Sequence, residues 1–184
     1  MVFTDTPIRG AVVIDPQPRT DERGSFSRLW CEREFAAHGL KARFVQCNGS
    51  VSVRKGTIRG LHYQSEPHAE VKLVRCIRGS VFDVVVDVRP ESETYLQWYA
   101  VELSAANGRM IYVDQGLAHG FLTLEDDSEV TYPVSEFYTP DAERGIRWDD
   151  PLFAIVWPVM SAFHLSPKDR TWPDFVREPR EPRP

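Results

Sequence analysis

Two histidines and a lysine stand at regular distances from glycines, and these residue types could do chemistry together. Gly56 precedes His62 with five residues between them, and Lys72 precedes Gly79 with six residues between them. The segment that ends at His119 reads Asp-Gln-Gly-Leu-Ala-His. An imidazole can accept a proton near neutral pH, and an ammonium can stabilise a negative charge that develops nearby. Together they suit removal of a proton next to a carbonyl, because the cation stabilises the enolate that forms.

The spacing resembles the two-motif frame of cupin barrels, in which four side chains usually hold a metal. In this chain the four positions carry His62, Gln64, Lys72 and His119, so a lysine replaces the usual glutamate. An ammonium has three donors and no lone pair, and it therefore repels a cation. We expect no metal at this site.

Composition excludes several classes of partner. The chain has 184 residues, enough for one domain with a sizeable core, and we expect a single domain over 1–184 with its core at about 8–173. A net charge of −5 with scattered basic residues predicts no nucleic-acid partner. The N-terminus has no signal-peptide pattern, and the apolar runs are too short to span a membrane. The three cysteines form no C-x-x-C pair, which is typical of reduced cytoplasmic thiols.

Short β-rich segments, separated by glycine, proline, asparagine and aspartate, predict an all-β fold. We expect an antiparallel jelly-roll barrel of the cupin type with short flanking helices. The expected strands are 11–14, 25–30, 44–53, 57–64, 70–78, 81–88, 97–103, 109–113, 120–124, 129–135 and 153–157. A helix is expected at 31–38, closed by Gly39, and the proline-rich residues 177–184 are expected to form a loose tail.

The alternation of side chains along a strand sorts the candidates by face. His62 shares a face with Gly60 and Gln64, whereas Arg59 is expected on the opposite face. Lys72 shares a face with two apolar residues, Val74 and Cys76, and Tyr132 shares one with Val130 and Val134. A charge on a partly apolar face is costly unless the protein uses it, so we expect Lys72 to point into a pocket.

These residues are part of a longer resemblance to the dTDP-4-dehydrorhamnose 3,5-epimerase family, over roughly residues 8–173. The matching segments are GTIRGLHYQ at 56–64, Lys72, RG at 78–79, VDVR at 86–89, GLAHGF at 116–121, Tyr132, GIRWDDP at 145–151 and SPKD at 166–169. The resemblance implies a jelly roll that works without metal or cofactor, usually as a homodimer. It also implies epimerisation at C3 and C5 of a nucleotide-linked 4-keto-6-deoxyhexose.

Roles follow from the resemblance, position by position. His62 would remove the proton next to the C4 ketone, and Asp169 would hold this imidazole. Lys72 would stabilise the enolate oxygen, and Tyr132 would return a proton on the opposite face. Substrate-binding positions are Arg23, Gln46, Cys47, Asn48, Arg59, His119, Tyr138, Glu143 and Lys168, with Tyr138 stacking on the nucleobase.

Two residues depart from the family pattern. Arg28 stands where the family usually has a glutamate at the nucleotide end of the site, contributed across the dimer. A guanidinium only donates hydrogen bonds, so it cannot replace a carboxylate that accepts them from a base. Asp114 stands where the family usually has a proline before the Gly-x-x-His turn, and the fixed φ of proline is lost there.

Several functions stay open at this point. The leading one is conversion of dTDP-4-dehydro-6-deoxyglucose to dTDP-4-dehydro-L-rhamnose. An epimerase that acts at one carbon only would use the same residues, and Arg28 keeps a GDP- or CDP-linked keto-sugar in view. A metal-dependent cupin and a non-catalytic sugar-binding cupin are alternatives from other classes.

Overall fold

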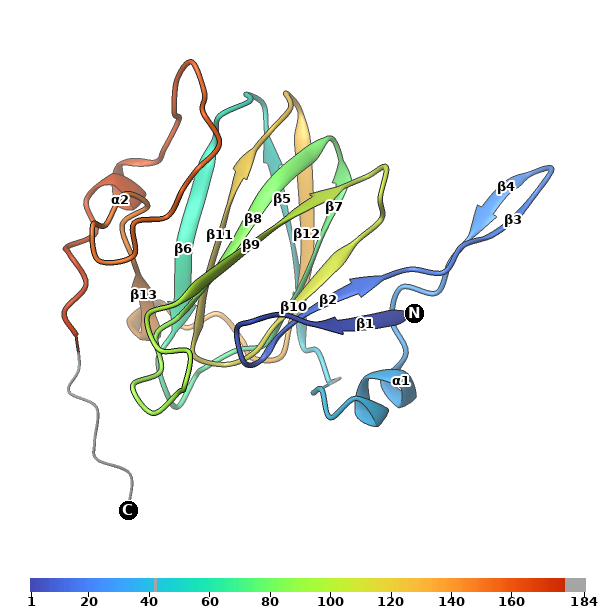
Figure 1. Ribbon diagram of the computed structural model, residues 1–184, viewed down its shortest axis with the longest axis horizontal. Coiled ribbons are helices and arrows are strands. Elements are labelled where there is room, and N and C mark those ends of the chain that lie inside the picture. Colours follow the sequence, from blue (N-terminus) through green and yellow to red (C-terminus); the bar gives the residue numbers. More distant parts are fainter. Residues whose placement is uncertain (42, 178–184) are drawn as a thin grey trace.

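Two antiparallel sheets pack face to face as a jelly roll in the computed structural model, which describes residues 1–41 and 43–177 (Figure 1). The six-stranded sheet is ordered β1 (Val2–Asp5), β2 (Ala11–Asp15), β10 (Met110–Val113), β7 (Lys72–Arg78), β12 (Ser128–Val134) and β5 (Gln46–Ser52). The five-stranded sheet is ordered β13 (Glu143–Gly145), β6 (Ile58–Gln64), β11 (Leu117–Thr123), β8 (Ser80–Asp87) and β9 (Trp98–Ser104). The predicted all-β jelly roll is confirmed.

Three apolar clusters hold these layers together. The main cluster fills the space between the sheets with alternate side chains of the central strands, including Val74, Val85 and Phe121. A second cluster lies on the outer face of the six-stranded sheet, where helix α1 (Glu32–Ala37) buries Phe35 completely. A third lies on the outer face of the five-stranded sheet, beneath loops from the last third of the chain. Burial of both outer faces leaves the barrel interior as the place for a cavity.

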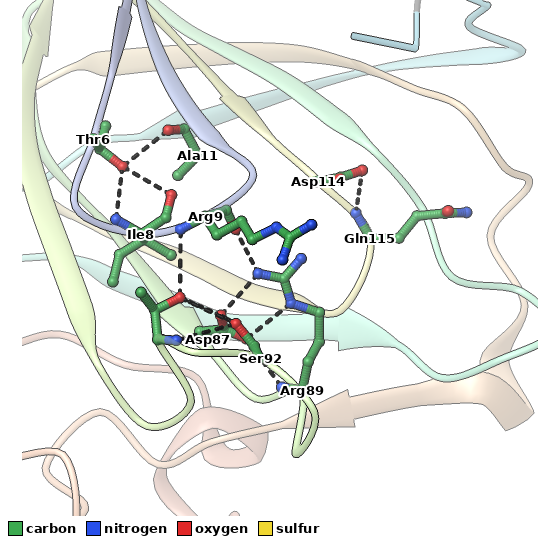
Figure 2. A network of polar contacts seen from close by, with 10 residues as sticks. Thr6, Ile8, Arg9, Ala11, Asp87, Arg89, Ser92, Asp114 and Gln115 are labelled. Carbon is green, nitrogen blue, oxygen red and sulfur yellow. Dashed lines mark hydrogen bonds and ion pairs between the residues drawn. The ribbon is translucent and has the colours of Figure 1, made fainter. Parts of the chain in front are cut away.

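A buried carboxylate fastens the N-terminal loop to the barrel (Figure 2). Asp87 is fully buried and accepts hydrogen bonds from the Arg89 backbone and guanidinium and from the hydroxyls of Ser92 and Thr94. Burial alone would raise the pKa of Asp87, but these donors outweigh it and hold the pKa below its usual value. Arg89 also donates to the carbonyl of Arg9. The VDVR segment is therefore a structural anchor.

Asp114 adds to the same anchor. Its backbone N–H donates to the carbonyl of Gly10 at 3.0 Å, and its carboxylate accepts from the N–H of Gln115 at 2.9 Å. A proline has no N–H and could not make the first bond. The departure from the family pattern therefore replaces a fixed φ with two hydrogen bonds.

An irregularity in β6 changes which side chains face the cavity. His119 pairs with His62 and Phe121 pairs with Arg59, so β6 has one more residue than β11 between these points. Gly60 lies in the extra stretch with φ of 119°, and a Cβ there would be 2.5 Å from the Cα of Gly120. The extra residue reverses the alternation, and Arg59 lines the same cavity as His62. The prediction that they face opposite ways was wrong for this reason.

Other differences from the predicted elements have local causes. Residues 153–157 form no strand, because Phe153 and Ala154 turn back onto the Asp150 carbonyl and Ala154 has φ of 47°. The expected strand at 120–124 begins earlier, at Leu117, so that His119 belongs to β11. The predicted helix at 31–38 is confirmed as α1, with Cys31 and His38 as its caps. Of the expected loose tail, residues 178–184 lie outside the described residues.

A hairpin projects away from the barrel on the N-terminal side (Figure 1). Only the start of the strand expected at 25–30 forms, as β4 (Gly24–Phe26), and it pairs with β3 (Arg19–Asp21) in a separate two-stranded sheet. All six residues of the two strands are exposed, and Phe26 is 74% exposed. In the described part of the chain, no helix is long and apolar enough to span a membrane.

Candidate active site

A cavity of about 530 Å³ opens between the two sheets at one end of the barrel. The five-stranded sheet contributes His62, and the six-stranded sheet contributes Lys72 and Tyr132. Eleven of the thirteen predicted site residues line this cavity. They are Gln46, Asn48, Arg59, His62, Lys72, His119, Tyr132, Tyr138, Glu143, Lys168 and Asp169.

An imidazole–carboxylate pair forms one wall of the cavity. His62 Nε2 lies 2.6 Å from Asp169 Oδ1, which belongs to the short helix α2 (Pro167–Arg170). Burial acts to raise the pKa of Asp169, but hydrogen bonds from His62, Ser166 and the Gly60 backbone outweigh it and lower the pKa. Asp169 is therefore ionised, and an ionised carboxylate only accepts hydrogen bonds. The proton of neutral His62 accordingly sits on Nε2, which leaves Nδ1 as the basic nitrogen.

A close contact between an aromatic ring and a glycine sets the position of α2. Gly145 in β13 pairs with His62, and a Cβ on Gly145 would be 2.1 Å from the ring of Trp172. The Trp172 ring therefore packs directly on the strand beside His62, with 6.3 Å between the two ring centroids. This contact explains why glycine is needed in the GIRWDDP segment.

Lys72 extends from β7 into the cavity, and its side chain is only 8% exposed. The ammonium forms an ion pair with the carboxylate of Glu70 and lies 3.5 Å from the carbonyl oxygen of His62. The apolar residues Val74 and Cys76 follow on the same face, in the main core. The prediction that Lys72 points into a pocket is confirmed.

Tyr132 lies on β12, beside β7, and packs against the main core with its ring. Burial raises the pKa of this phenol, and the negative charge of Glu70 raises it further, while Arg59 acts in the opposite direction. A raised pKa keeps the hydroxyl protonated at neutral pH. Tyr132 can therefore donate a proton, which is one requirement of an acid catalyst.

A second histidine–carboxylate pair lies deeper in the barrel. His119 Nε2 is 2.8 Å from Asp83 Oδ2, and the Asp83 side chain is fully buried. Burial raises the pKa of Asp83, although the contact with His119 opposes this. The pair fixes the orientation of the His119 ring at the cavity wall.

Charged and aromatic groups surround the open end of the cavity. Glu143 accepts hydrogen bonds from the Tyr138 hydroxyl at 2.7 Å and from the Lys168 ammonium at 2.5 Å. Burial tends to raise the pKa of Glu143, but these two donors lower it. Arg59 bonds to the Ser52 hydroxyl and the Val51 carbonyl, which holds its guanidinium beside β5.

Two predicted binding residues do not line the cavity. Arg23 lies on the exposed hairpin, where its side chain is 84% exposed and pairs with Asp21 at 2.6 Å. Cys47 is exposed on the outer face of β5, because Gln46 and Asn48 point inward and neighbouring side chains alternate. The predicted contribution of the Cys47 side chain to this cavity was wrong. Arg28 also lies away from the cavity and pairs with Glu34 at 2.6 Å.

The residues at the four cupin metal positions do not fit a metal. The Gln64 amide donates to the carbonyls of His68 and Phe137 and accepts from the N–H of Thr139, so it is used to hold loops. Lys72 brings a positive charge to the position that usually carries a glutamate. Among the described residues, no group of three or more His, Cys, Asp or Glu side chains is arranged to hold a metal ion.

Three cavity residues were not foreseen. Glu70 and Asp83 supply the carboxylates for Lys72 and His119, and the Ser50 hydroxyl is buried at the cavity wall without a hydrogen-bond partner. Alternation could have found the first two. Glu70 is two residues before Lys72, and Asp83 stands between Val81 and Val85, which face the core.

Taken together, a base on one sheet faces a cation and a proton donor on the other, which can exchange protons at carbons next to a carbonyl. This chemistry, in a jelly roll of the cupin type, defines a class of isomerases. A family model described as dTDP-4-dehydrorhamnose 3,5-epimerase matches residues 5–177. The chain therefore belongs to the dTDP-4-dehydrorhamnose 3,5-epimerase family.

Individual relatives agree with this assignment. A dTDP-4-dehydrorhamnose 3,5-epimerase of Methanothermobacter thermautotrophicus is 46% identical over 179 residues, which cover 96% of each chain. The crystal structure of such an enzyme from Elizabethkingia anophelis has a TM-score of 0.92 at 40% identity, covering 95% of this chain and 96% of that one. A dTDP-6-deoxy-D-glucose-3,5-epimerase from Legionella pneumophila, solved with dTDP-4-keto-L-rhamnose, has a TM-score of 0.86 at 40% identity, covering 91% and 89%.

The ionised state of Asp169 has a consequence for stability. Because its folded pKa lies below the ordinary value of 3.8, the carboxylate stabilises the fold above that pH and loses this effect as the pH falls through the folded pKa. Asp169→Asn should lower the free energy of unfolding by about 1–3 kcal/mol at neutral pH. The difference from the parent protein should shrink as the pH falls below 3.8. Urea unfolding at several pH values measures it.

Asp141→Asn is the matched control, since Asp141 is exposed and should give no pH-dependent difference. A gap between Asp169→Asn and the parent that stays constant down to acidic pH would contradict the assignment.

Proposed function

We propose that the protein epimerises C3 and C5 of dTDP-4-dehydro-6-deoxy-D-glucose and so forms dTDP-4-dehydro-L-rhamnose, a step of dTDP-rhamnose biosynthesis. The observation that carries the proposal is the His62–Asp169 pair on one sheet, facing Lys72 and Tyr132 on the other. The relatives described above, named for this reaction, support the same substrate.

Each inversion needs a base and an acid on opposite sides of the sugar ring. Nδ1 of His62 removes the proton next to the C4 ketone, and the electron pair moves onto the ketone oxygen to form an enolate. The ammonium of Lys72 stabilises this oxyanion. Tyr132 then gives its proton to the same carbon from the other face, and proton exchange with water restores His62 and Tyr132.

The rest of the cavity suits the nucleotide part of the substrate. Arg59 and Lys168 supply positive charge for a diphosphate, with Gln46, Asn48 and His119 nearby on the cavity wall. Tyr138 at the open end has the flat ring that stacks on a nucleobase, and Glu143 holds its hydroxyl. These assignments make the site specific for a sugar nucleotide rather than a free sugar.

Base catalysis by His62 has a direct test. His62→Ala should lower the rate of solvent deuterium incorporation into the keto-sugar by about 100-fold or more, because a general base contributes about 10²–10⁴-fold. NMR of the substrate in deuterated water measures the exchange at C3 and C5 separately. The same spectra distinguish inversion at both carbons from an epimerase that acts at one.

His68→Ala is a suitable control, because this histidine does not line the cavity. Full deuterium exchange in His62→Ala would overturn the mechanism. Binding of the sugar nucleotide without exchange in the parent protein would favour a non-catalytic sugar-binding cupin.

We also propose that the enzyme is a cytoplasmic homodimer and that the projecting hairpin reaches the partner subunit's site. The exposed Phe26 and the row of exposed residues on β3 and β4 suit contact with a second copy. This arrangement would bring Arg23 to a nucleotide end of a cavity, which its own barrel does not do. The free thiols of Cys31, Cys47 and Cys76 support a reducing compartment.

Arg23→Ala should raise KM about tenfold and leave kcat nearly unchanged, because one charge-assisted hydrogen bond contributes about 1.5 kcal/mol. Arg19→Ala, on the same exposed hairpin, is the control and should not change KM. Sedimentation of the parent protein should give the mass of two chains. A monomer, or an unchanged KM in Arg23→Ala, would refute the shared site.

A GDP- or CDP-linked keto-sugar is the second candidate substrate, because Arg28 cannot accept hydrogen bonds and is held by Glu34. We expect kcat/KM to be highest for the dTDP-linked sugar, since Tyr138 stacks on any base and the relatives are named for dTDP sugars. Parallel assays with the three nucleotides measure this. A higher kcat/KM with GDP or CDP would transfer the proposal to that substrate.

A further inference from the structure

The carboxylate of Glu70 is a second charge inside the enolisation site. Glu70 stands two residues before Lys72, so that both side chains leave the same face of the chain. They form an ion pair in which the carboxylate side chain is 11% exposed and the ammonium side chain 8% exposed. Both line the cavity beside Tyr132. The cation that would stabilise the enolate is therefore already bound to a fixed anion.

This contact limits how the ammonium can point. A lysine ammonium is a mobile point charge on a flexible stem, with three N–H donors. One N–H is directed to Glu70, and the His62 carbonyl at 3.5 Å is in reach of a second. With two donors directed to the protein, the third is left for a ligand oxygen in the cavity.

We propose that Glu70 is a positioning residue for the epimerisation, which fixes the Lys72 ammonium so that its remaining N–H meets the ketone oxygen of the sugar. The proposal rests on the proposed function. Glu70 also offsets the cost of burying Lys72, because a buried charge without a partner is strongly unfavourable. A lysine without this carboxylate would be free to turn toward solvent or toward a phosphate of the substrate.

The same carboxylate acts on the proton donor. Burial and the negative charge of Glu70 both raise the pKa of Tyr132, so that the phenol keeps its proton. The groups that face this phenol from the surrounding elements are Glu70 and Lys72 beside β7, Cys47 on β5, Arg59 and His62 on β6, His119 on β11 and Glu143 on β13. Among the residues with a resolved influence on the Tyr132 pKa, Glu70 has the largest electrostatic effect.

Two variants separate positioning from a merely structural role. Glu70→Gln keeps a hydrogen-bond acceptor for Lys72 and removes the negative charge, whereas Glu70→Ala removes both. In both variants the alkaline limb of the pH–kcat profile should move to lower pH, because Tyr132 loses its proton more easily. Glu70→Ala should also lower kcat about tenfold or more with a smaller change in KM, because the ammonium interacts most strongly with the enolate in the transition state.

Glu102→Gln is the matched control, since it removes one negative charge from an exposed position on β9. Its pH profile should coincide with that of the parent. If Glu70→Ala fails to fold, Glu70→Gln decides. A parent-like alkaline limb in Glu70→Gln overturns the proposal, and so does a change confined to KM.

A measurement without turnover keeps this test independent of the proposed function. The ultraviolet absorbance of the Tyr132 phenolate, obtained by subtracting the titration of Tyr132→Phe in each background, should develop at lower pH in Glu70→Gln than in the parent. An inactive parent with a shifted titration would refute the proposed reaction and retain the action of Glu70. An active parent with an unshifted titration would refute the role of Glu70 alone.

Discussion

Charged groups line a cavity whose walls are otherwise the apolar interior of a barrel, and each buried charge there needs a partner. An unpaired buried ion costs several kcal/mol, so the fold must deliver both members of every pair to the same place. In the described part of the chain the pairs along this cavity are His62–Asp169, Lys72–Glu70, His119–Asp83 and Lys168–Glu143. Their members come from separate strands and from α2, with only Lys72 and Glu70 close in sequence. The pairing therefore ties the chemistry of the site to the topology of the barrel.

Two close backbone contacts make this pairing possible. Gly60 and Gly120 allow β6 and β11 to approach where β6 carries its extra residue, and Arg59 turns toward the cavity there. Gly145 lets the Trp172 ring lie on β13, which brings the following helix, and with it Asp169, against His62. A side chain at these positions would separate the elements that hold the charges. The glycines in the motifs are thus part of the geometry of catalysis, although they take no part in proton transfer.

The division of labour between the sheets follows from the same geometry. The proton acceptor lies on the five-stranded sheet, and the cation and proton donor lie on neighbouring strands of the six-stranded sheet. A planar enolate between two sheets is open to proton transfer from both faces. The hairpin of β3 and β4, in contrast, makes no part of this cavity and projects outward (Figure 1). The enolisation site is thus built within one barrel, whereas the nucleotide end is the part that a second subunit would complete.

Local patterns in the sequence were enough to predict the jelly roll, most of its strands and the cavity-facing positions of Lys72 and Tyr132. Alternation along a strand and the residue types of a motif are properties of a few neighbouring residues. The sequence alone did not determine that Arg59 shares a face with His62, because a strand irregularity depends on its partner strand. Nor did it assign Glu70 and Asp83 as counter-ions, or exclude residues 153–157 as a strand. Those features depend on which strands lie side by side and which charges meet across the barrel, and only the tertiary structure decides that.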